Sequence, residues 1–77
     1  MELLRLRDLR PGQRARIRTI ELSGGMRRRL RDIGLIEDTP VECLSAGPGG
    51  SPRAFLVRGM VLALRAGDSG RIWVEKE

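Results

Sequence analysis

The residue types that usually catalyse reactions or bind metal ions are scarce in this chain. Its 77 residues include no histidine, no tyrosine and one cysteine, so the common proton shuttles and the commonest metal ligand are missing. The acidic residues are scattered, and Glu37 and Asp38, just past a predicted helix, are typical of a solvated turn. We therefore expect a protein that is not an enzyme, with no cofactor-binding residues and no metal ligands.

The single cysteine, Cys43, allows two interpretations. A reactive or metal-binding thiolate would need a histidine or a second cysteine as partner, and the sequence offers neither. In the segment Val41-Glu42-Cys43-Leu44, Cys43 shares a strand face with Val41, which favours a small buried side chain. One cysteine also excludes an intrachain disulfide, and a reducing cytoplasm is the expected location.

Arginine is the residue type most suited to binding a partner in this chain. Fourteen of the 15 basic residues are arginines, which bind carboxylates and phosphates in a flat, bidentate way. They are unevenly spread. Residues 1–31 hold ten arginines and three acids, a balance of +7, whereas residues 32–77 hold five basic and seven acidic residues, a balance of −2. We therefore expect one basic surface.

A short amphipathic helix is predicted over about residues 25–33. Its apolar residues Met26, Leu30 and Ile33 follow the i, i+4, i+7 spacing of one helix face. Gly34 is placed as a left-handed C-terminal cap, and Leu35 is placed to fold back on the last turn. The preceding Ser23-Gly24-Gly25 could cradle an anion at the helix start, but a tight turn is the favoured interpretation.

The other side of this helix carries the candidate partner-binding residues Arg27, Arg28 and Arg31. At 100° per residue they lie roughly 100–200° from Met26 and should point to solvent or to a partner, while Arg29 should lie along the barrel wall. Three interpretations stay open for them: a solvated face, a docking site for an acidic protein surface, and a phosphate-binding site.

The rest of the chain predicts a mainly β fold. An N-terminal helical turn should bury Leu6 and Leu9, ending at the turn Pro11-Gly12. Alternating polar and apolar residues then predict five short strands, at 14–19, 39–45, 54–57, 61–64 and 71–75. A Gly/Pro-rich loop is expected at 46–52 and a turn at 67–70. Five strands and one helix indicate a small closed or nearly closed barrel as a single domain, residues 1–77.

No segment suits direct insertion into a membrane. The longest apolar run, residues 60–64, is far below the roughly 20 residues that span a bilayer. Any association with a membrane is therefore expected to occur through a partner.

The order and spacing of several motifs resemble the FeoA family over nearly the whole chain. The similarity runs through Leu6-Arg-Asp-Leu-Arg-Pro-Gly12, Gly25-Met-Arg-Arg-Arg-Leu-Arg-Asp-Ile-Gly-Leu35, Val57-Arg-Gly59, Leu62-Ala-Leu-Arg65 and Ile72-Trp-Val74. Positions within these motifs that are expected to be structural are Gly12, Leu30, Gly34, Leu35, Gly59 and Leu64. The sequence departs from the family where Ile36-Glu-Asp-Thr-Pro40 replaces a Pro-Gly-Thr turn, where Gly50-Ser51-Pro52 replaces Gly-Asp-Pro, and where Gly67 and Gly70 replace helix formers.

This resemblance implies a five-stranded SH3-like barrel that acts as a cytoplasmic, non-enzymatic accessory protein of ferrous iron transport. Its partner would be the GTP-hydrolysing FeoB transporter, which would hold it at the inner membrane surface. Similar domains occur in iron-dependent repressors of the diphtheria-toxin-repressor type. The family is often associated with transition metal ions, but this sequence supplies no evident ligand set, so the resemblance implies iron transport without an iron site.

Two alternatives compete with this interpretation. A small basic barrel could bind nucleic acid, although the chain has one predicted helix where a helix-turn-helix needs two, and few aromatic residues for stacking bases. Exposed strand edges could also pair between copies and form a homo-oligomer, which is compatible with a role in iron transport.

Overall fold

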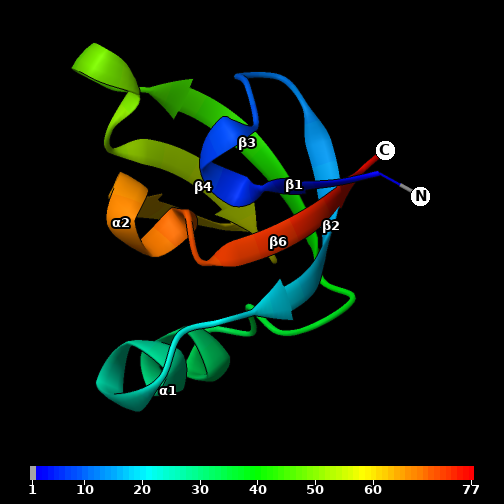
Figure 1. The fold of residues 1–77 in the computed structure, drawn as a ribbon, viewed down its shortest axis with the longest axis vertical. Helices are drawn as coiled ribbons and strands as arrows, with labels where there is room; N and C mark the ends of the chain where they lie inside the picture. Colours follow the sequence, from blue (N-terminus) through cyan, green and yellow to red (C-terminus); the bar gives the residue numbers. More distant parts are fainter. Residues whose placement is uncertain (1) are drawn as a thin grey trace.

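The computed structural model describes residues 2–77, so Met1 of the predicted domain lies outside the described residues. These residues form one antiparallel sheet with the strand order β1-β6-β2-β3-β4-β5 (Figure 1). The six strands are β1 (Leu3–Arg5), β2 (Arg14–Ile20), β3 (Pro40–Ala46), β4 (Arg53–Val57), β5 (Met60–Leu64) and β6 (Ile72–Lys76). Two α-helices, α1 (Gly24–Asp32) and α2 (Ala66–Ser69), and two 3₁₀ turns, Leu6–Asp8 and Pro48–Gly50, connect them.

The sheet curls around a core built from alternate residues of each strand. Ala15 and Ile17 of β2, Phe55 and Val57 of β4, and Val74 of β6 are fully buried. Register shifts between Ile17 and Thr19 and between Cys43 and Ser45 interrupt the ladders, and such bulges increase the local twist. The buried residues form one cluster, so a 77-residue chain with a single phenylalanine closes its core by curling the sheet.

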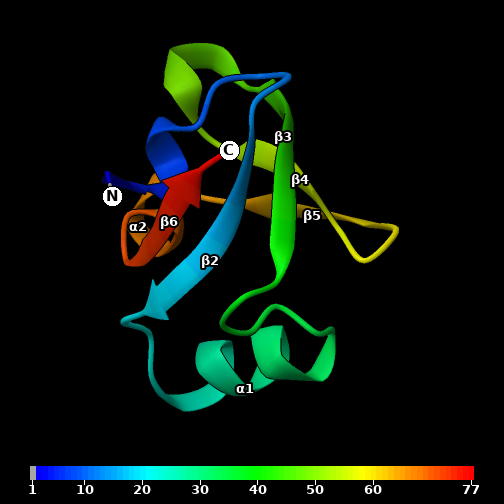
Figure 2. The same cartoon turned by 90° about the vertical axis from the view of Figure 1, so that its right-hand side faces the viewer.

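Helix α1 lies at one end of the curled sheet, outside the strands (Figures 1 and 2). It is attached through Leu30, which is buried in the core cluster, while Met26 and Ile33 are partly buried against it. Gly34 follows with φ of +91°. The N–H of Leu35 donates to the carbonyl of Leu30 (2.9 Å), and the N–H of Gly34 donates to the carbonyl of Arg31 (3.0 Å). These two bonds form a Schellman motif, so the predicted helix and its glycine exit agree with the structure.

The sequence-based outline is right in class and wrong in three details. The N-terminal helical turn is present at Leu6–Asp8, with Leu6 and Leu9 fully buried, but Leu3–Arg5 before it forms a sixth strand. This strand pairs with β6, a long-range contact that local spacing does not reveal. The predicted turn at 67–70 belongs mostly to α2, and the predicted irregular loop contains the 3₁₀ turn Pro48–Gly50.

Two tight turns require residues with positive φ. Gly12 (φ +90°) follows Pro11 and donates its N–H to the carbonyl of Cys43 (2.8 Å), which closes the loop before β2 onto β3. Arg58 (φ +50°) and Gly59 (φ +79°) form the two-residue loop between β4 and β5. Positive φ at both positions is the type I′ geometry that suits the twist of a β-hairpin.

Candidate functional site

The exposed side of α1 forms an arginine surface without internal counterions. Arg28, Arg29 and Arg31 are exposed, and among residues 2–77 no ion pair of 4 Å or less includes any of them. We call these three residues the α1 arginine face. Arg29 was expected along the barrel wall; it is exposed, and it lines a small pocket together with Leu62 and Leu64 of β5.

Arg27 differs from its neighbours on α1. It is half-buried, and its guanidinium donates a hydrogen bond to the carbonyl of Ile20, the last residue of β2. Arg27 was expected to point to solvent or a partner with Arg28 and Arg31. The structure gives it a contact within the chain, because α1 follows β2 closely enough for a long side chain to reach back. Arg27 therefore ties α1 to the sheet.

The arginines on the outer face of β2 are matched by acidic residues. Arg14 pairs with Glu42 of β3 (3.3 Å), and Arg16 pairs with Glu77 (3.8 Å). Arg18 donates to Glu75 of β6 at 2.9 and 2.7 Å and also pairs with Asp38. These hydrogen bonds, chiefly the one to Glu75, raise the pKa of the Arg18 guanidinium.

Asp38 is a residue that the sequence analysis undervalued. It lies in an exposed turn, as predicted, and there its carboxylate pairs with Arg18 and its carbonyl accepts a hydrogen bond from Arg16 (2.7 Å). Its φ of +71° lies in the left-handed region, which aspartate and asparagine adopt more often than most residues other than glycine. The alternation of Arg14, Arg16 and Arg18 could have indicated an outward cationic row, but no local signal shows which acids face it.

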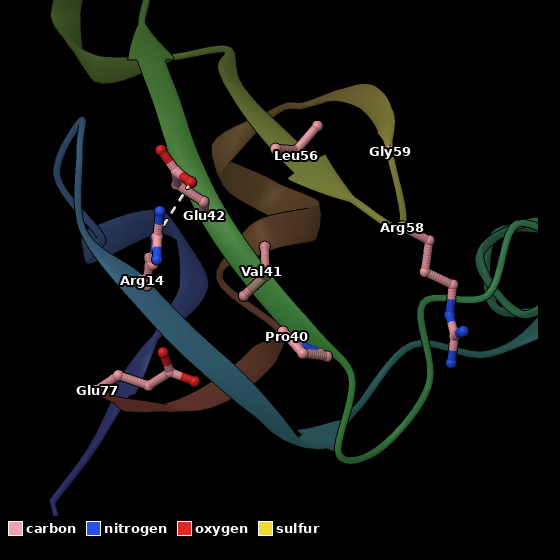
Figure 3. A pocket seen from close by; sticks show the side chains of 8 residues that line it. All are labelled: Arg14, Pro40, Val41, Glu42, Leu56, Arg58, Gly59 and Glu77. Atoms are coloured by element: carbon pink, nitrogen blue, oxygen red, sulfur yellow. Dashed lines mark ion pairs between the residues drawn. The ribbon is translucent and has the colours of Figure 1, made fainter.

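A shallow groove of about 400 Å³ lies beside this row (Figure 3). Pro40, Val41 and Leu56 give it an apolar floor, and Arg14 and Glu42 face each other across its edge. Arg58 points away from the groove floor (Figure 3), because its Nε donates to the carbonyl of Gly34 (3.0 Å). The groove thus combines an apolar surface with an internally paired charge, and it contains no nucleophile or acid–base pair.

The described residues do not fit a metal ion. Nowhere in residues 2–77 do three or more His, Cys, Asp or Glu side chains gather at one place. Cys43 is fully buried, with its Sγ 3.8 Å from the carbonyl oxygen of Ser45, which confirms the prediction of a small buried side chain. It belongs to the cluster of buried hydrophobic residues.

The remaining residues singled out from the sequence lie in the framework around these surfaces. Leu35 and Leu64 are buried in the core, and Gly34 accepts hydrogen bonds from both Thr39 (3.1 Å) and Arg58. Trp73 is half-buried, with its Nε1 donating to Glu21 (2.9 Å) and the Arg5 guanidinium 5.1 Å from its ring centre. The one tryptophan is therefore engaged within the chain.

Neither α1 nor α2 has the length and apolar composition needed to cross a bilayer, and they are the only α-helices in the described part of the chain.

The curled antiparallel sheet forms a small SH3-like barrel domain with a helix outside it. The model of the FeoA domain matches residues 4–76, so the chain belongs to the FeoA family. No curated protein sequence matches it.

Solved structures agree with this membership. The FeoA protein from Chlorobium tepidum is 30% identical, with a TM-score of 0.88 over 95% of this chain and 70% of its own. The FeoA protein of Stenotrophomonas maltophilia, complexed with zinc, is 28% identical, with a TM-score of 0.79 over 94% of this chain and 89% of its own. It is described as an SH3 domain protein, and a role as a ferrous iron transport activating factor has been suggested for it.

The fold also recurs in regulatory proteins, as the sequence resemblance implied. A manganese-dependent transcriptional repressor superposes with a TM-score of 0.85 over 97% of this chain and 42% of its own. At 18% identity this similarity shows the fold alone.

Proposed function

We propose that this protein is a non-enzymatic accessory factor of ferrous iron transport that binds the cytoplasmic GTPase region of a FeoB-type transporter. Residues 1–77 act as one domain in the cytoplasm, and the partner recruits it to the inner membrane surface. Membership of the FeoA family supports the link to iron transport.

The observation that carries the docking part of this proposal is the α1 arginine face. Its three cations are exposed and have no counterion in the described part of the chain, and the helix that carries them lies outside the sheet (Figure 2). Arginine pairs with carboxylates through two parallel hydrogen bonds, so a surface of this kind suits an acidic partner surface. Arg28 and Arg31 carry the contact, and Arg27 holds the helix in place.

The test is a binding titration between this protein and the purified cytoplasmic region of the transporter. Arg28→Glu and Arg31→Glu should each weaken binding at least about tenfold, because charge reversal replaces attraction with repulsion. Arg10→Glu is the matched control: it makes the same charge change at an exposed arginine far from α1 in sequence. It should change the affinity little.

Three results would overturn the proposal. The first is an absence of binding together with normal iron uptake after deletion of the protein under iron limitation. The second is an equal loss of affinity in all three variants, which would indicate a response to net charge alone. The third is tight, salt-dependent binding of a DNA duplex or single-stranded RNA at physiological ionic strength, which would favour the nucleic-acid alternative.

A further inference from the structure

Strand β5 is an unprotected edge of the sheet. It pairs with β4 on one side, and the strand order leaves its other side without a neighbouring strand. Natural proteins usually protect such edges with charged residues, proline, bulges or very short strands. The opposite edge strand, β1, has three residues and includes Arg5. By contrast, β5 has five residues, Met-Val-Leu-Ala-Leu, with no charge, no proline and a regular register.

The hairpin geometry identifies the free backbone groups on this edge. The two-residue loop makes Val57 and Met60 the closing pair, which exchanges both hydrogen bonds, and alternate pairs along the ladder do the same. Val61 and Ala63 therefore point their N–H and C=O groups away from β4. Residues 60–64 make no backbone hydrogen bond to turns or loops of the described chain, and the Val61 residue is 68% exposed.

A small pocket lies next to this edge, between β5, α1 and α2. It has a volume of about 190 Å³ and is lined by Met26, Leu30 and Leu62, with Arg29 and Arg65 also contributing. The volume suits one apolar side chain. Among the described residues Asp68 is the only acid that lines it, beside the two arginines, so the pocket combines apolar side chains with a net positive charge. Arg58 stands just before the other end of β5.

We propose that β5 accepts an extended segment of a partner protein as an added strand, with apolar residues at the centre of the segment and acidic residues at its ends. The segment would hydrogen-bond to Val61 and Ala63, place one apolar side chain in the pocket beside α1, and set its acidic ends against Arg58 and Arg65. Strand addition of this kind takes affinity from backbone bonds and specificity from side-chain pockets. The inference rests on the proposed function and specifies how the partner docks.

Charge favours a partner segment over a second copy of this chain. If two β5 strands paired antiparallel about Leu62, Arg65 of each copy would face Gly59 of the other and lie next to its Arg58. Four arginines would then gather at the two ends of the shared strand pair, where like charges repel. An acidic segment would neutralise the same residues.

The experiment uses the full chain and a labelled probe peptide, acetyl-EEVLVLEE-amide, followed by fluorescence anisotropy and amide chemical-shift mapping. Binding should perturb residues 60–64 and the pocket. The charge-swapped peptide acetyl-KKVLVLKK-amide should bind at least about tenfold more weakly. Val61→Pro should weaken binding by a similar factor without unfolding the protein, because its N–H faces the free edge and makes no ladder bond. Val61→Ala, which keeps that N–H, should bind normally.

A second experiment does not depend on the folding of the proline variant. It uses the wild-type protein and peptides with N-methyl groups on alternate residues. One alternate set should abolish binding and the other should not, because only one edge of an added strand faces β5. Equal binding of Val61→Pro and wild type, or equal binding of both methylated sets, would overturn the inference. A wild-type dimer that Val61→Pro dissociates, seen by sedimentation, would also overturn it in favour of a second copy.

The outcomes separate this inference from the proposed function. If the transporter region binds and depends on Arg28 and Arg31 but not on Val61, the edge inference fails and the proposed function stands. If the probe peptide binds at β5 while the transporter region does not bind at all, the proposed function fails and the edge remains a docking site.

Discussion

The outer face of β2 and the α1 arginine face each carry three arginines, yet they differ in whether these arginines are paired with acidic residues. On β2, Arg14, Arg16 and Arg18 each have a carboxylate within 4 Å. On α1, Arg28, Arg29 and Arg31 have none among the described residues. The arginines of β2 are paired with carboxylates of the same chain, whereas those of α1 are left to interact with solvent or with a partner.

The difference arises from how strands and helices acquire neighbours. A strand takes its cross-strand neighbours from distant parts of the sequence, and here the register places Glu42 opposite Arg14 and Glu75 opposite Arg16. A helix residue is flanked mainly by residues three and four positions away in its own sequence. On α1 these are mainly arginines and glycines, and Asp32, the one acid of the helix, makes no ion pair of 4 Å or less with Arg28 or Arg29. Arginine content alone therefore does not identify a binding surface.

The largest effect is expected from weakening the packing that holds α1, and with it the α1 arginine face, against the sheet. Leu30 is the only residue of α1 that is fully buried among those described, so Leu30→Ala should lower the free energy of unfolding by about 2–5 kcal/mol. Chemical denaturation measures this loss, and hydrogen exchange should show α1 opening first. Met26→Ala, at a half-buried position, is the control with a smaller effect. Full stability of Leu30→Ala would mean that α1 is not anchored through this leucine.

A smaller effect is expected at the end of α1. Gly34→Ala places a Cβ at φ of +91° and 2.5 Å from Cδ of Arg58, and the left-handed conformation costs a non-glycine residue about 1–2 kcal/mol. The free energy of unfolding should fall by about that amount. Adding Arg58→Ala relieves the contact but not the backbone strain, so most of the loss should remain. Complete rescue by the double substitution would assign the cost to the contact instead.

The smallest effect compares the two arginine faces directly. Arg18→Gln should lower the midpoint of thermal unfolding slightly, because it removes pairs with Glu75 and Asp38, and high salt should reduce the difference from wild type. Arg31→Gln should leave the midpoint unchanged, because no internal pair is lost. Thermal unfolding at low and high salt measures both. If the two variants behaved alike, the contrast between the faces would be wrong.

Much of the fold could be predicted from local patterns. The alternation in residues 14–19 and 71–75 and the spacing of Met26, Leu30 and Ile33 identified strands and the helix, because burial on one face imposes a period on the sequence. Strand β1 escaped prediction because three residues are too few to show a period, and its strand conformation depends on pairing with β6.

The candidate site was less predictable than the fold. Helical spacing located Arg28 and Arg31 on an outward face, but it could not show that Arg27 reaches back to Ile20. The run Met60–Leu64 could be interpreted from the sequence as a buried strand. Its exposure follows from its place at the end of the strand order, which is a property of the whole sheet.

The sequence by itself determined the small β-rich barrel, its one substantial helix with a glycine exit, the burial of Cys43 and the resemblance to the FeoA family. These depend on residue types and short-range spacing, which a linear chain records. Only the tertiary structure decided which arginines are neutralised, which edge strand is left open, and what lies beside it. Those properties depend on contacts between residues as far apart as Arg18 and Glu75, and such contacts exist only once the sheet has formed.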